Sequence, residues 1–126
     1  MLGSVAIFVP AISVRKMEKA VTLAADSIYF DLEDSVAPDQ KDEARDCLQN
    51  FLADHGGREK CLLARINSVG SPWWSQDVAA LAYCPALSGL VLPNADLASV
   101  SLLTDQLDRF DSRLKIVPLI ETARGL

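Results

Sequence analysis

Two kinds of segment alternate along this sequence, and the alternation limits the possible folds more than any other feature. Short apolar runs rich in β-branched residues are followed by longer segments of mixed polarity, in which apolar residues recur at helical spacing. Short runs between turn residues favour strands, and the helical spacing favours helices. The predicted strands are residues 5–9, 27–32, 62–66, 90–92 and 115–120, and the predicted helices are residues 16–25, 40–52, 74–83 and 97–110. This order predicts an α/β protein with a parallel sheet and right-handed crossovers.

The second predicted helix carries signals at both ends. Asp39 follows Pro38 and is predicted to cap the helix N-terminus. Gly56 and Gly57 follow the helix, as glycines beyond a helix end often do.

Two architectures have this order of elements, an open doubly wound sheet and a (β/α)8 barrel. A doubly wound nucleotide-binding sheet carries a glycine-rich phosphate loop after its first strand, but residues 10–15 read P-A-I-S-V-R. Neither G-x-G-x-x-G nor G-x-x-x-x-G-K occurs anywhere in the sequence, which argues against dinucleotide or nucleoside triphosphate binding. A complete barrel needs about 250 residues, so the 126 residues here suffice for only part of one.

Charge and hydropathy exclude further classes of partner. The net charge is −5, and no basic run is longer than the pair at residues 15 and 16, so nucleic acid is not an expected partner. The apolar stretch at residues 5–12 contains Pro10 and is predicted to be a buried strand and not a targeting segment. No apolar run approaches the roughly 18 residues of a membrane helix. Three cysteines without C-x-x-C spacing fit reduced thiols in a cytoplasmic protein.

Polar residues follow the predicted strands at their carboxyl ends, where parallel α/β folds bind ligands. Because side chains alternate along a strand, Glu33 shares a face with Tyr29 and Asp31, and Arg65 lies on the same face of the next strand. Parity on four strands predicts one mouth, lined by Glu33, Arg65, Asn94 and Glu121. The alternative is that these are ordinary strand-end charges, solvated or paired with one another.

The charges at this mouth indicate which ligands it can bind. Asp31, Glu33 and Asp34 repel one another unless a cation, an arginine or protonation compensates them. Arg65, with Asn67 predicted on the same face, offers a planar fork for a carboxylate of the protein or of a substrate. Carboxylates with an arginine suggest Mg²⁺, which prefers one or two carboxylates plus water and substrate oxygens.

Other catalytic chemistries are disfavoured. The single histidine, His55, lies in a polar helix-end context, which argues against zinc. No Ser-His-Asp or Cys-His arrangement can be built around a predicted strand end.

Several motifs occur in a characteristic order along the chain. They are F-V-P-A at residues 8–11, D-L-E-D-S-V-A-P at 31–38, R-I-N at 65–67, L-V-L-P at 90–93 and P-L-I-E-T-A-R-G at 118–125. Together they resemble the citrate lyase β-subunit-like proteins of the HpcH/HpaI aldolase/citrate lyase family, over essentially the whole chain. The motifs at 31–38 and 118–125 are the specific ones.

The resemblance implies a TIM barrel, of which residues 1–126 form one partial domain with the first five strands and four helices. It implies a Mg²⁺-dependent lyase that cleaves a carbon–carbon bond of a 3-hydroxyacyl thioester, such as citryl-CoA or malyl-CoA, presented by CoA or an acyl carrier. A homo-oligomer is expected, a trimer in the family. Arg65 and Glu121 are the implied catalytic and substrate-binding residues, with Glu121 as the metal ligand. Glu33 and Asp34 are the implied acidic pair beside the substrate.

The sequence also departs from the family pattern. Asn94 stands where the family usually has lysine, and the sequence stops at Leu126, before the strand that carries the family's second metal-binding aspartate. One alternative is therefore a truncated, non-catalytic relative that pairs with another chain, and another is a class II aldolase acting on free pyruvate-type acids. We expect the isolated chain to associate through its open strand edges. We also expect it to bind Mg²⁺ more weakly than a complete barrel, through Glu121.

Overall fold

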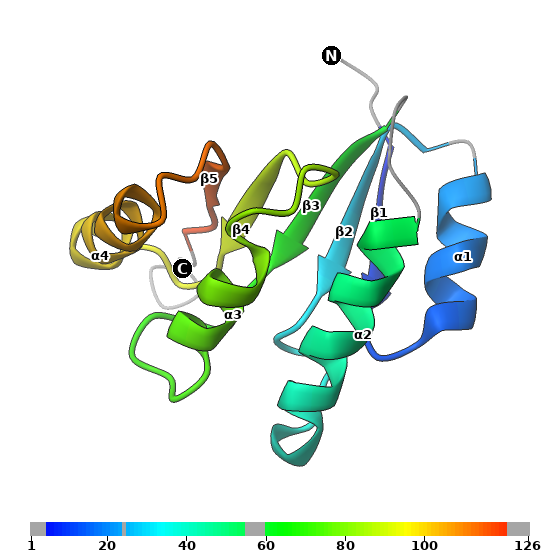
Figure 1. The fold of residues 1–126 in the computed structure, drawn as a ribbon, viewed down its shortest axis with the longest axis horizontal. Coiled ribbons are helices and arrows are strands. Elements are labelled where there is room, and N and C mark those ends of the chain that lie inside the picture. Colours follow the sequence, from blue (N-terminus) through cyan, green and yellow to red (C-terminus); the bar gives the residue numbers. More distant parts are fainter. Residues whose placement is uncertain (1–4, 24, 55–59, 121–126) are drawn as a thin grey trace, which may run out of the picture.

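The strands lie side by side in the order in which they occur along the chain (Figure 1). The computed structural model describes residues 5–23, 25–54 and 60–120. All neighbouring strands pair in parallel, and they are β1 Ala6–Pro10, β2 Ser27–Asp31, β3 Cys61–Arg65, β4 Gly89–Leu92 and β5 Lys115–Pro118. A doubly wound sheet reverses its strand order at a switch point, whereas a barrel adds each strand beside the preceding one. The observed order is therefore that of the first five strands of a (β/α)8 barrel.

The helices connect successive strands and contact one another in series, α1 with α2, α2 with α3 and α3 with α4. They are α1 Val14–Thr22, α2 Lys41–Asp54, α3 Trp74–Leu81 and α4 Leu97–Arg109. Each predicted strand and helix is present, with the largest difference at the end of α1. That helix ends at Thr22 because Leu23 already has extended backbone angles.

The predicted cap at Asp39 is wrong. Asp39 lies inside a short 3-10 helix, η1 Pro38–Gln40, which runs directly into α2. Pro38 starts this turn with a ring that fixes the backbone angle helices need, so α2 has no separate side-chain cap at this residue. Gly56 and Gly57 lie outside the described residues.

The two faces of the sheet differ as the alternation predicts. Ile28, Phe30 and Leu62 are fully buried beneath the helices. The opposite face, here called the inner face, carries Phe8 and, one strand further along, Tyr29. Phe8 is 51% exposed. Its further members are Leu63, Asp31, Arg65, Val91 and Val117.

Within the described residues, β1 and β5 each pair on one side only. Association of the chain through these edges stays a prediction. No helix in the described ranges is long and apolar enough to cross a membrane.

Candidate active site

The carboxyl ends of β2 and β3 bring Asp31 and Arg65 together on the inner face. The strand register places these residues side by side. Arg65 Nε donates to Asp31 Oδ1 and Arg65 Nη2 donates to Asp31 Oδ2, both at 2.9 Å. The two side chains are 16% and 5% exposed. This two-bond pairing fixes the plane of the guanidinium group.

Asp31 is held from several directions at once. Its carboxylate also accepts hydrogen bonds from the backbone N–H of Glu33 and from the backbone N–H and Oγ of Ser35, at 2.9, 3.0 and 2.9 Å. Burial raises the pKa of this carboxyl, but the Arg65 fork and the Glu33 and Ser35 donors together hold the pKa at about 2. Asp31 is therefore ionised at neutral pH and fully occupied as an acceptor.

Glu33 lies beside this pair and is less constrained. Its Oε1 is 3.5 Å from Arg65 Nε, and the side chain is 25% exposed. Burial raises the pKa of Glu33, as do the neighbouring Asp34 and Asp31, while Arg65 and Lys41 oppose the rise. Asp34 is exposed. Arg65 thus compensates Asp31 and Glu33, which is one of the three kinds of compensation that the sequence left open.

The guanidinium group of Arg65 also lies over an aromatic ring. Arg65 Cζ lies 5.1 Å from the centroid of the Phe8 ring, a cation–π distance. The Phe8 and Tyr29 rings are 4.7 Å apart. Arg65 is held between a carboxylate and a ring. Among the described residues, no acceptor is found for its Nη1.

Three other predicted positions have different outcomes. Asn94 is exposed, and its Nδ2 donates to Ser68 Oγ at 3.1 Å, over the loop after β3. The prediction that Asn67 shares the face of Arg65 is wrong, because the backbone N–H and Nδ2 of Asn67 bind the buried carboxylate of Asp77 in α3. Glu121 lies outside the described residues, so its predicted place at the mouth stays a prediction.

Sequence reasoning missed a buried polar network that joins α2, α3 and the loop after β3. Arg45 Nε donates to Asp77 Oδ1 at 3.0 Å. Asp77 Oδ2 accepts from the backbone N–H and Nδ2 of Asn67, at 2.9 and 2.7 Å. Burial raises the pKa of Asp77, against the Asn67 and Arg45 hydrogen bonds. Arg45 Nη1 also donates to Asp42 Oδ1 at 2.7 Å.

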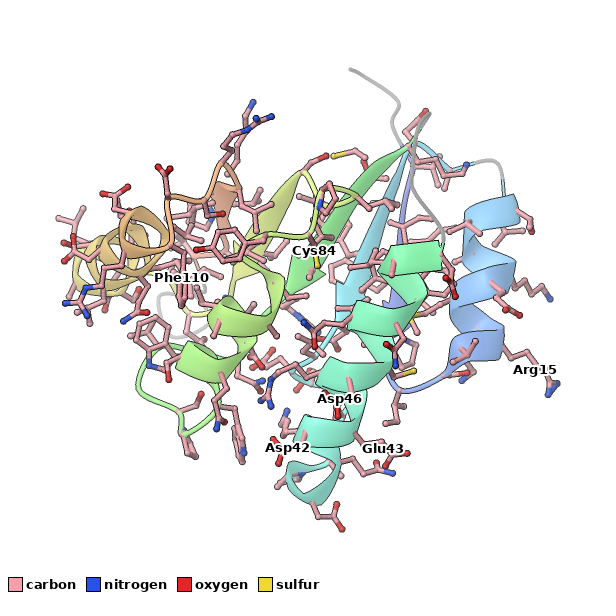
Figure 2. All side chains as sticks on the ribbon, viewed as in Figure 1. Arg15, Asp42, Glu43, Asp46, Cys84 and Phe110 are labelled. Atoms are coloured by element: carbon pink, nitrogen blue, oxygen red, sulfur yellow. The ribbon has the colours of Figure 1, made fainter. Side chains whose placement is uncertain are left out.

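A signal for this network exists in the sequence. Lys41 and Arg45 are four residues apart and flank Ala44, which belongs to the buried stripe of α2, so both point toward the core. By contrast, the acidic residues Asp42, Glu43 and Asp46 of α2, which are labelled in Figure 2, are exposed.

The described residues do not form a complete metal site. No group of three or more His, Cys, Asp or Glu side chains is placed to hold a metal within residues 5–23, 25–54 and 60–120. Asp31 has its acceptor positions filled, which leaves Glu33 as the carboxylate beside Arg65. One or two carboxylates with water and substrate oxygens suit Mg²⁺, so the donor chemistry fits this ion if Glu121 contributes.

Stability should depend on pH through Asp31. Its folded pKa of about 2 lies below the usual 3.8, so the Arg65 pair stabilises the fold above pH ~4 and loses this effect as the pH falls toward 2. The free energy of unfolding should drop by about 2 kcal/mol over that range. In Asp31→Asn most of this drop should vanish, as urea denaturation between pH 2.5 and 6 would show. The raised pKa of Glu33 acts with the opposite sign, and this opposing effect should be smaller in Asp31→Asn because Asp31 is one of its causes. An unchanged pH dependence in Asp31→Asn would contradict the assignment.

Comparison of the sequence with known proteins identifies a family and several relatives. The family model of the HpcH/HpaI aldolase/citrate lyase family matches residues 4–126. A (3S)-malyl-CoA thioesterase of Cereibacter sphaeroides is 36% identical over 122 residues, which is 95% of this chain and 41% of that protein. An L-malyl-CoA/β-methylmalyl-CoA lyase of the same species is 35% identical over 118 residues, 86% of this chain and 37% of that protein.

A solved structure has the same fold. Protein CitE of Mycobacterium tuberculosis, in complex with magnesium, acetoacetate and coenzyme A, superposes with a TM-score of 0.76 at 32% identity, over 98% of this chain and 41% of that one. The chain thus spans about two fifths of the length of these relatives. The family match over residues 4–126 agrees with the sequential parallel sheet and the motif order. The chain belongs to the HpcH/HpaI aldolase/citrate lyase family.

Proposed function

We propose that this chain forms the N-terminal part of the active site of a Mg²⁺-dependent lyase that cleaves 3-hydroxyacyl-CoA thioesters of the malyl type. The observation that carries the proposal is Arg65, fixed at the carboxyl end of β3 by Asp31 and Phe8. Support comes from the malyl-CoA lyase relative and from the CitE complex with magnesium, acetoacetate and coenzyme A.

Arg65 would bind the free carboxylate of the substrate. Its guanidinium group has five N–H donors, of which the Asp31 fork uses one on Nε and one on Nη2. The remaining donors on Nη1 and Nη2 match a carboxylate or keto oxygen. A malyl thioester presents such a carboxylate next to its hydroxyl-bearing carbon, so Arg65 would orient the carbon whose bond breaks.

Cleavage removes the proton of that hydroxyl group, and the carbon becomes a carbonyl. The electron pair of the broken carbon–carbon bond moves to the carbon beside the thioester, which then takes up a proton. The products are glyoxylate and acetyl-CoA, and negative charge develops on the thioester oxygen during the reaction. Mg²⁺, when bound, would stabilise that charge as a Lewis acid. Glu121 would hold the ion, and Glu33 and Asp34 would border the substrate.

Hydrolysis of the same thioester is a second candidate function. The specific observation in its favour is the 36% identity to the (3S)-malyl-CoA thioesterase. Arg65 would bind the same carboxylate in this reaction, but water would attack the thioester carbonyl. Malate and free CoA thiol would then be the products. The curated relatives described above act on CoA thioesters, which favours these two reactions over an aldolase for free pyruvate-type acids.

A product assay separates these candidates. The chain is incubated with malyl-CoA or citryl-CoA, with Mg²⁺ or with a chelator, and carbonyl product, acetyl-CoA and free thiol are measured in parallel. We expect equal amounts of glyoxylate and acetyl-CoA from malyl-CoA, in the presence of Mg²⁺ only. Free thiol without carbonyl product would identify the thioesterase. No product from either thioester would overturn the proposed lyase activity of this chain and favour a non-catalytic relative.

A further inference from the structure

Lys41 is buried, whereas the acidic residues of α2 are exposed. It is the first residue of α2 and is 5% exposed. Its Nζ donates to the backbone carbonyls of Leu32 and Glu33, at 3.0 and 2.7 Å. The ammonium group also lies 5.1 Å from the centroid of the Trp73 ring. A buried charge of this kind is satisfied by the loop that follows β2.

The contacts of Lys41 meet those of Asp31 at one residue. The backbone N–H of Glu33 donates to Asp31, and its backbone carbonyl accepts from Lys41. The carboxylate of Glu33 makes no hydrogen bond within the described part of the chain and lies 3.5 Å from Arg65 Nε. Because no hydrogen bond from the described residues holds the Glu33 side chain and its ion pair with Arg65 is long, the position of the carboxylate also depends on these two backbone anchors.

Lys41 can act as an anchor because the start of α2 is itself fixed. One helical turn further on, Arg45 binds Asp77 at the start of α3, and Asp77 holds the loop after β3 through Asn67. The two loops at the carboxyl ends of β2 and β3 are therefore tied to the same face of α2. A shift of one loop relative to the other would break contacts that are buried.

We propose that Lys41 is a positioning residue, which sets the Glu33 carboxylate beside Arg65 by holding the Leu32 and Glu33 carbonyls. This inference rests on the proposed function in one respect, namely that the Glu33 carboxylate borders the substrate. Lys41 itself reaches backbone oxygens and has no part in the chemistry.

The chain contains a matched control. Lys60 Nζ also donates to two backbone carbonyls, of Leu23 and Ala25, at 2.7 and 2.9 Å. These contacts lie before β2, at the amino end of the sheet and away from Glu33. Lys60→Met removes the same kind of contact as Lys41→Met without touching the candidate site.

Amide hydrogen exchange tests the anchor without any activity. We expect Lys41→Met to speed the exchange of the Glu33 and Ser35 amides about tenfold or more. In the variant, the loop after β2 can open without breaking the two charge-assisted hydrogen bonds of Lys41. Lys60→Met should leave both amides within about twofold of the wild type, and Lys41→Arg should restore most of the protection. Unchanged exchange in folded Lys41→Met would overturn the proposal.

Two further measurements complete the test. Should Lys41→Met fail to fold, the Lys41 ammonium protons of the wild type are observed by NMR: slow exchange with contacts to Glu33 supports the anchor, and rapid averaging refutes it. In the product assay, Lys41→Met should lower kcat/KM roughly 10- to 100-fold, with partial rescue by Lys41→Arg. An inactive wild type with the expected exchange pattern would refute the proposed function and leave the positioning role supported.

Discussion

Replacing Asp77 by alanine should destabilise the fold by about 3 kcal/mol. Asp77 is 1% exposed and binds Arg45, whose side chain is 9% exposed. Without Asp77, a guanidinium group would stay buried with one donor already unpartnered among the described residues, Nη2, and the Asn67 donors would lose their acceptor. Such a loss is a large part of the 5–15 kcal/mol that typically stabilises a domain. Urea denaturation at neutral pH measures the change.

Asp42 provides the control for this prediction because it binds the same arginine from the surface. Its side chain is 84% exposed, and exposed ion pairs contribute about 0–1 kcal/mol. Asp42→Ala should therefore change the free energy of unfolding by less than about 1 kcal/mol. Adding Arg45→Met to Asp77→Ala should recover about 1 kcal/mol, since it removes the buried guanidinium group that has lost its buried partner. Equal losses for Asp77→Ala and Asp42→Ala would show that burial does not set the strength of this network.

Replacing Arg65 by lysine should lower kcat/KM for the thioester about 100-fold or more, if the proposed function holds. Lysine keeps the positive charge but has no planar fork, so it cannot pair with both Asp31 oxygens and still present donors to a substrate carboxylate. The measurement is the product assay with malyl-CoA at saturating Mg²⁺. Circular dichroism and thermal unfolding of the same samples separate a loss of activity from a loss of folding.

The matched control is Arg113→Lys. Arg113 is exposed in the turn before β5, at the amino end of the sheet. Its replacement should leave kcat/KM within about twofold of the wild type, since surface substitutions away from a site have small effects. Activity of Arg65→Lys within twofold of the wild type would contradict the role assigned to Arg65.

Much of the fold follows from local patterns in the sequence. Period-two alternation placed Phe30 and Leu62 against the helices and Tyr29 and Arg65 on the inner face, and the structure confirms these positions. Such predictions succeed because each strand is bounded by turn residues and each apolar stripe has a single face to bury. The proximity of Glu33 to Arg65 was predicted on the same basis.

Long-range polar partners were harder to predict. Asn67 follows the end of β3, and its direction is set by Asp77, ten residues further along and on a different element. Arg45 and Asp77 are 32 residues apart, and no local pattern relates them. The sequence left open whether the partner of Arg65 is a protein or a substrate carboxylate, and the strand register shows that Asp31 is one partner.

The order of the strands also has a consequence for how the chain is made. Each strand after β1 pairs with the strand synthesised just before it, and Ala6 meets Ser27 only 21 residues later. Each of the strands β2 to β5 therefore finds a partner that has already been synthesised. Pairing with the preceding strand keeps each loop closure shorter than it would be in a rearranged strand order. The growing polypeptide can hide its strand edges one after another during translation, which shortens the time in which each newly made edge is open to aggregation.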